Sequence, residues 1–253
     1  MFIVWGAVVL ASCASLSTTP LNTTETMMWC TYPLASQKVI GTCFLVAVRD
    51  PHLPGRYRPV VVTSTHVLKA AGNDPLSIPL RMIGAHGQVF FALVEVGGAD
   101  KTPPYYVCHP TQDVAAFLLP VPTDLEPLLV VRLLEENHLA GGDSRAGDAV
   151  AFLGFPEGLP GSPDLFPVLR EGCVASYDPN QLAARLFLIN SDVYPGDSGA
   201  PVFRVSPKGK PKVVGMVVER LEIREGERSP LALAVDGGVI RETLQLLANR
   251  RED

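Results

Sequence analysis

The sequence has 253 residues, of which 47% are hydrophobic, and this is enough apolar material to fill the core of one large β domain or two small ones. A disordered chain is therefore excluded. The net charge is −5 and the lysines and arginines are scattered, so the chain lacks the basic patch that a nucleic-acid partner requires.

The first residues resemble an export signal. Phe2–Ala11 is an apolar run that is too short to span a bilayer as a helix. Leu10–Cys13 resembles the lipobox of bacterial lipoproteins, which would lipidate Cys13 and anchor the chain to a bacterial membrane, although no lysine or arginine precedes the run. Three alternatives stay open. The protein is a periplasmic or cell-envelope lipoprotein, a secreted protein with a cleaved signal, or neither of these. Residues 1–28 are assigned to the signal and to a Ser/Thr-rich tether.

After the tether, short β-rich runs alternate with glycine and proline, which is the pattern of β-barrels and sandwiches. Only the end is helical, because Val239, Ile240, Leu244 and Leu247 form an apolar stripe at helical spacing. The sequence predicts an all-β protein with a C-terminal helix. The expected strands are Val39–Val48, Pro59–Thr63, Val89–Val96, Val114–Leu119, Ala149–Phe155, Val168–Tyr177, Arg185–Asn190, Ala200–Val205, Lys212–Glu219 and Leu231–Val235.

A glycine-rich turn, Pro195–Pro201, carries the candidate nucleophile Ser198. Glycine on both sides allows backbone conformations that let the amides of Gly196 and Ser198 point together at a developing oxyanion. Taken alone, the Gly-x-Ser-x-Gly pattern also fits a surface turn. No histidine follows Ser198, so a general base must come from upstream, in the order His, Asp, Ser.

Two upstream residues fit that order. His66 directly follows an apolar strand, where a base would be well positioned, although a lone histidine is more often a satisfied structural residue. Asp113 opens another buried strand, where a turn or strand-edge acid is the simpler interpretation. Neither residue is decisive alone, but with Ser198 they occur in the right order and at strand or turn boundaries.

These residues and four further stretches resemble the trypsin-like serine peptidases, in particular the HtrA-like bacterial branch without PDZ domains. The stretches are Gly41–Val46, Gly147–Pro156, Lys212–Val217 and Leu231–Val235. The resemblance implies two six-stranded antiparallel Greek-key β-barrels followed by a C-terminal helix. The first barrel would span residues 29–125 and the second residues 126–253.

The resemblance also implies a function, that of an exported serine endopeptidase acting on proteins or peptides. Ser198 would attack the scissile carbonyl, His66 would carry its proton and Asp113 would orient the imidazole. Neither an organic cofactor nor a metal is expected, because the other histidines lack metal-ligand spacing. The alternative is a catalytically idle trypsin fold that serves as a binding or scaffold module. The oligomeric state stays open.

Substrate preference is implied through four positions. Asp192 lies six residues before Ser198, which is the offset of the aspartate at the base of the Arg/Lys-specific pocket of trypsin. HtrA-like relatives build this loop differently and prefer small apolar residues, so a surface aspartate is the other interpretation. Val217, Val218 and Glu219 would form a wall of the pocket, and Glu219 would either assist a basic side chain or be solvated.

Asp197 departs from the HtrA-like pattern, in which asparagine is more frequent. Trypsin-like zymogens pair this aspartate with a new N-terminus released by cleavage, and Lys38–Gly41 imitates such a site. That site runs directly into the next strand, so this activation is rejected and Asp197 needs another partner.

The cysteines other than Cys13 could form two disulfides in three pairings. The resemblance favours Cys30 with Cys173, and burial as free thiols is the alternative.

Overall fold

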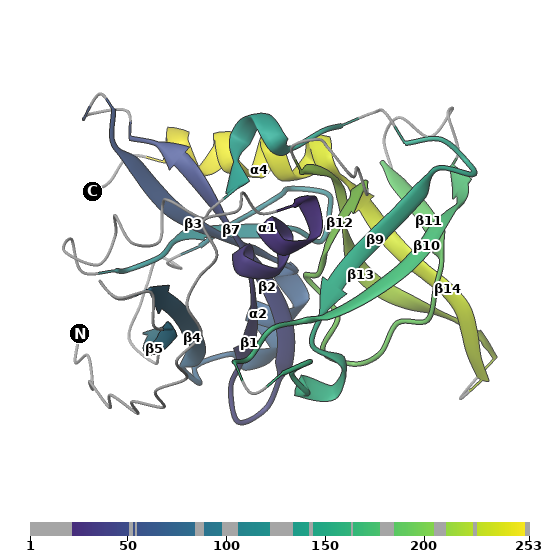
Figure 1. Cartoon of the computed structure of the whole chain (residues 1–253), viewed down its shortest axis with the longest axis horizontal. Helices are drawn as coiled ribbons and strands as arrows, with labels where there is room; N and C mark the ends of the chain where they lie inside the picture. Colours follow the sequence, from purple (N-terminus) through teal and green to yellow (C-terminus); the bar gives the residue numbers. More distant parts are fainter. Residues whose placement is uncertain are drawn as a thin grey trace.

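The computed structural model describes residues 22–50, 53, 55–83, 89–97, 106–121, 134–141, 144–162, 164–177, 185–204, 211–224 and 227–250. These residues form an N-terminal sheet, a C-terminal barrel and three α-helices, and Figure 1 shows the sheet and the barrel side by side. The predicted signal run and Cys13 lie outside the described residues.

The N-terminal half begins with helix α1 and then forms most of one sheet. Its strand order is β5-β4-β1-β2-β3-β7-β6, and β8 pairs with β2 outside this path. Helix α2 follows β3. The elements are α1 (Thr23–Cys30), β1 (Thr31–Ala35), β2 (Ile40–Arg49), β3 (Tyr57–Thr63), α2 (Thr65–Ala71), β4 (Leu76–Ile83), β5 (Val89–Val96), β6 (Val107–Cys108), β7 (Ala115–Leu118) and β8 (Leu134–Glu135).

The C-terminal half forms a closed barrel of antiparallel strands in the order β10-β11-β14-β13-β12-β9. Short 3₁₀ turns lie at Glu136–His138 and Pro156–Gly158. The elements are β9 (Ala149–Gly154), β10 (Val168–Tyr177), β11 (Leu186–Asn190), β12 (Pro201–Arg204), β13 (Lys212–Arg224), β14 (Glu227–Asp236) and α4 (Gly237–Asn249).

The prediction of two six-stranded barrels is correct for the C-terminal half and wrong for the N-terminal half. Within the described residues the N-terminal sheet stays open, with β5 at one edge and β6 at the other. The edge strand β6 has only two residues and pairs with β7, so it does not complete a ring with β5. β8 lies after the expected boundary at residue 126, yet it pairs in parallel with β2 of the first sheet.

Helix α1 starts inside the segment expected to be a tether. Asn22 caps it, because its side chain accepts a hydrogen bond from the Glu25 amide at 2.8 Å, and the Glu25 carboxylate accepts one from the Asn22 amide at 2.8 Å. This reciprocal capping box satisfies two amides that the first helical turn leaves free. Met27 and Cys30 then bury their side chains in the core, so the folded part extends further toward the N-terminus than expected.

One of the hydrophobic clusters is shared by both halves. It joins Phe44 and Val62 of the N-terminal sheet to Phe203 of the barrel and to Val239 and Leu244 of α4. In Figure 1, α4 runs along one side of the molecule, and it packs against β6 and β7 as well as β13. Because apolar burial is the main favourable term in folding, this shared core holds the two halves as one body.

The preferred pairing of Cys30 with Cys173 is wrong, because all four cysteines of the described chain are free thiols. Cys30 and Cys43 are fully buried, whereas Cys108 and Cys173 are half-buried. Burial raises the pKa of Cys30 to about 12, and it also raises the pKa of Cys43. Both buried thiols therefore stay protonated and act as small apolar side chains.

Candidate active site

Pairing of two strands brings His66 and Asp113 together. Thr63 at the end of β3 pairs with Ala115 at the start of β7. Asp113 lies just before β7, and His66 lies in the first turn of α2, just after β3. The Nδ1 atom of His66 is 2.5 Å from Oδ2 of Asp113, and the His66 amide donates to Oδ1 at 2.9 Å. The carboxylate therefore fixes the ring and leaves Nε2 for another partner.

The charge state of His66 follows from these contacts. The hydrogen bond to Asp113 raises the pKa of His66 from its ordinary value of 6.5, and partial burial opposes this change. The negative charges of Asp113 and Glu219 raise the pKa further. Since 49% of the His66 side chain is exposed, the ring is accessible to a ligand from solvent.

The Ser198 turn has a backbone that only glycine can adopt at Gly196. Its φ is +97°, and a Cβ there would lie 2.3 Å from the Phe155 carbonyl oxygen. The amides of Asp197 and Gly199 donate to the carbonyls of Tyr194 and Val217 at 3.0 and 2.8 Å. Within the part of the chain that the structure describes, the amides of Gly196 and Ser198 have no acceptor. These two N–H groups flank Asp197 and are available for an anionic oxygen.

Thr42 of β2 fastens this turn to the N-terminal sheet. Its amide donates to the Ser198 carbonyl at 2.8 Å, and its hydroxyl donates to the Gly196 carbonyl at 2.7 Å. The same hydroxyl accepts a hydrogen bond from the Phe155 amide at 3.2 Å. Sequence reasoning noted the stretch that contains Thr42 but not this role.

Ser198 and His66 both lie beside β13. The Ser198 hydroxyl donates to the Val218 carbonyl at 3.3 Å, and the next residue, Glu219, is one of the charges that act on His66. Gly41 lies between Val67, which follows His66, and the Ser198 turn. A Cβ at this position would lie 2.8 Å from the Val67 side chain and 3.4 Å from the Ser198 carbonyl oxygen. The structure thus joins His66 to Asp113 and places Ser198 where the two halves meet, but among the described residues no hydrogen bond links Ser198 to His66, and the Ser198 hydroxyl contacts Val218 instead.

The residues expected to bind substrate differ in their surroundings. Val217 and Val218 are buried in β13, whereas Glu219 is exposed next to them. Asp192 is also exposed, in the loop that leads to the Ser198 turn. A role for Asp192 at the base of a specificity pocket stays a prediction.

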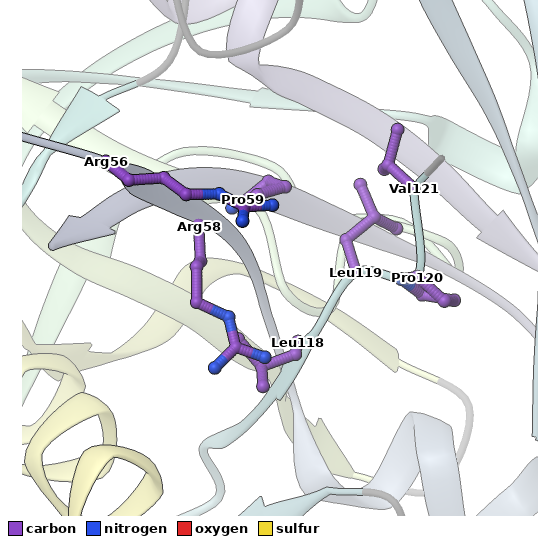
Figure 2. Close-up of a pocket in the computed structure, with 7 residues that line it drawn as sticks. All are labelled: Arg56, Arg58, Pro59, Leu118, Leu119, Pro120 and Val121. Carbon is purple, nitrogen blue, oxygen red and sulfur yellow. The ribbon is translucent and has the colours of Figure 1, made fainter. Parts of the chain in front are cut away.

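A separate pocket, shown in Figure 2, lies at the ends of β3 and β7. It is lined by Arg56, Arg58, Pro59 and residues 118–121, and the two arginine side chains lie on one side of it. None of the predicted substrate-binding residues belongs to this pocket.

Asp197 is completely buried, and its partner is Arg170 of β10, to which it is joined by an ion pair. Burial raises the pKa of Asp197, and the hydrogen bond and charge of Arg170 oppose that change. The sequence predicted the need for a partner but gave no signal for Arg170.

No three His, Cys, Asp or Glu side chains of the described chain come together as metal ligands. Among the described helices, none combines the length and the apolar character needed to cross a membrane.

Comparisons with known proteins identify the family of the chain. The model of the trypsin-like peptidase domain matches residues 41–216. The chain belongs to this family. The match confirms the resemblance seen in the sequence, and it makes proteins or peptides the substrates that the family implies. No curated protein matches the peptidase chain at a significant level.

Solved structures share the fold of this peptidase domain. A mutant, inactive form of Rv3671c from M. tuberculosis H37Rv has a TM-score of 0.56 and 16% identity, over 96% of this chain and all of that one. An inactive form of the Rv3671c protease has a TM-score of 0.53 and 19% identity, over 89% of this chain and 92% of that one. Deg5, of the HtrA/Deg family, has a TM-score of 0.60 and 15% identity, over 90% and 93% of the two chains.

Proposed function

We propose that the protein is an exported serine endopeptidase that cleaves peptide bonds through Ser198, His66 and Asp113. The observation that carries this proposal is the pair of amides without acceptors among the described residues, at Gly196 and Ser198, on the turn that bears the Ser198 hydroxyl. The imidazole of His66, bound to Asp113, supplies the base. Two such amide donors stabilise the charge that develops on a carbonyl oxygen during acyl transfer. A turn with a purely structural role would not need two backbone amides that lack hydrogen-bond acceptors.

The proposed reaction has two halves. The Ser198 hydroxyl turns from the Val218 carbonyl to Nε2 of His66, which takes its proton as Oγ bonds to the scissile carbonyl carbon. His66 then gives this proton to the leaving amine as the C–N bond breaks, which leaves an acyl ester on Ser198. A water molecule, deprotonated by His66, attacks the ester, and the proton returns to Oγ as the acid is released. Asp113 stabilises the imidazolium in both halves.

A fluorophosphonate probe tests the nucleophile. Ser198 Oγ should bond to phosphorus, fluoride should leave, and mass spectrometry should find the adduct on Ser198 alone. Ser198→Ala is the matched control and should stay unlabelled. If the folded protein is not labelled and cleaves no peptide library, it is an idle trypsin fold used as a binding module.

With a labelled protein, the same library also tests Asp192, because cleavage after arginine or lysine is expected only if this carboxylate faces the substrate.

The pH dependence of labelling tests the base. Only neutral imidazole accepts a proton, so the labelling rate should rise with pH through the pKa of His66, which lies above 6.5. Glu219→Gln removes one of the negative charges that raise this pKa, so the rise should move to lower pH. Glu95→Gln, at an exposed position of β5, is the matched control and should leave the profile unchanged. An unshifted profile for Glu219→Gln would show that the charge of Glu219 does not act on the His66 imidazole.

Export is proposed from the sequence alone, on the apolar run Phe2–Ala11, and lipidation on Cys13. Expression of the full chain in a bacterium, followed by fractionation, tests both. A Cys13→Ser variant that stays with the membrane fraction as the natural sequence does would exclude the lipid anchor.

A further inference from the structure

We propose that Arg170 is a positioning residue that holds Asp197, and so keeps the Gly196–Ser198 turn ready for catalysis without any cleavage of the chain. The inference rests on the proposed function and adds its regulation, because it makes the peptidase active as folded. It concerns a residue in strand β10, outside the Ser198 turn.

Asp197 occupies the centre of the turn. Its carboxylate accepts a hydrogen bond from the Tyr194 amide at 2.8 Å through one oxygen and pairs with Arg170 through the other. The Asp197 side chain has no exposed surface. A buried carboxylate without a cation is costly, so losing Arg170 would favour a backbone arrangement that brings Asp197 to water. Such an arrangement would also move the amides of Gly196 and Ser198.

The Arg170 side chain is held in place on two sides. Its guanidinium lies 4.7 Å from the centre of the Phe152 ring and 5.7 Å from that of Tyr194. Phe152 is the residue that faces Arg170 across the β9–β10 pair. Only 15% of the side chain is exposed, so the cation is shielded from competing salt and water.

Gly154 provides the space in which the ion pair forms. A Cβ at this position would lie 2.3 Å from Oδ1 of Asp197 and 3.1 Å from Nη2 of Arg170. Any larger residue would therefore displace the carboxylate. A glycine at the end of β9 thus leaves room for the ion pair between Asp197 and Arg170.

The chain offers no comparable cation by cleavage near Ile40. Residues 31–35 and 40–44 pair along their whole length as the β1–β2 hairpin, with Ala35 facing Ile40. Freeing an N-terminus at Val39 or Ile40 would cut this hairpin. Arg170 already pairs with one oxygen of Asp197, and the Tyr194 amide donates to the other.

The test compares second-order rate constants for fluorophosphonate labelling of Ser198 in the full chain. Arg170→Met should lower this rate about 100-fold, as expected when an oxyanion donor is displaced. Arg170→Lys keeps the positive charge but loses the planar guanidinium, so the labelling rate should fall about tenfold. Arg204→Met is the matched control, because Arg204 pairs with Asp148 in the same barrel but outside the turn, and it should label at the natural rate.

A double-mutant cycle separates positioning from general packing. In the Asp197→Asn background the turn holds no buried carboxylate, so Arg170→Met should then lower the labelling rate less than about threefold. This double variant also leaves no unpaired charge at these two positions, which keeps the test usable if Arg170→Met alone does not fold. Equal losses in both backgrounds, or an unchanged rate for Arg170→Met, would overturn the proposal.

The two proposals fail in different ways. If the unsubstituted protein is labelled neither as folded nor after limited proteolysis, the peptidase function itself is wrong. If that protein is labelled and Arg170→Met labels as fast, the function stands and only the role of Arg170 is wrong. Labelling only after proteolysis of the chain would show that another cation activates the turn.

Discussion

Asp113→Asn is expected to slow peptide hydrolysis by about 10⁴-fold while the protein stays folded. The Asp113 carboxylate contacts both the ring Nδ1 and the amide of His66, so it accepts two hydrogen bonds. An asparagine has one acceptor oxygen and one amino group. The backbone amide can only donate, so the oxygen turns toward it and the NH2 group faces Nδ1. The ring must then accept at Nδ1, which drives it to the wrong tautomer.

Turnover of a peptide identified from the library measures this effect, and circular dichroism verifies the fold. Asp148→Asn is the matched control, because Asp148 pairs with Arg204 away from His66, and its turnover should match that of the natural sequence. A loss of less than tenfold for Asp113→Asn would remove Asp113 from the catalytic machinery.

Arg81→Ala is expected to lower the free energy of unfolding by about 4 kcal/mol, because it leaves several buried carbonyls without a donor. Arg81 lies in β4 and is 2% exposed. Its guanidinium donates to the carbonyls of Leu165 at 2.6 Å and Met28 at 2.8 Å, and to that of Thr31.

The same guanidinium lies 4.2 Å from the centre of the Tyr32 ring and 4.6 Å from that of Phe166. In the described part of the chain no carboxylate pairs with Arg81, so carbonyl oxygens and ring faces balance its charge. Because Leu165 and Phe166 precede β10 of the barrel, the loss should destabilise both halves together.

Urea unfolding followed by fluorescence measures the Arg81 effect. Arg81→Lys should retain part of the stability, since an ammonium still reaches some of the carbonyls. Arg145→Ala, at an exposed position, is the matched control and should change the free energy of unfolding by less than about 0.5 kcal/mol. A loss below about 1 kcal/mol for Arg81→Ala would contradict this account.

Most strands could be predicted because their apolar residues are consecutive in the sequence, as in Ala149–Gly154. Strands β1 and β4 were missed because they contain Pro33 and Pro79, which usually interrupt strands. The structure tolerates both prolines because β1 and β4 pair with each other only at Ala35 and Ser77, which leaves one side of each strand open. The failure of the N-terminal sheet to close depends on long-range pairing that no local pattern records.

The residues of the candidate site also differ in whether the sequence could predict them. His66, Asp113 and Ser198 could be predicted because each sits in a recognisable local stretch, in the order that the chemistry uses. Arg170 and Thr42 could not, because they act on residues far away in the chain. Arg170 is 27 positions from Asp197, and Thr42 is 154 positions from Gly196. Only the folded structure pairs them.

The shared core also sets the order in which the molecule can mature. Phe44 and Val62 lie in the half that carries His66 and Asp113, yet they pack in one cluster with Val239 and Leu244 of α4. A nascent chain, made from its N-terminus, cannot bury this apolar face until residues 237–249 have been synthesised. The junction at which His66, Asp113 and Ser198 lie is therefore completed late, after the ribosome has produced nearly the whole described chain. For the proposed peptidase, this means that a half-made chain has no finished site with which to cleave other proteins.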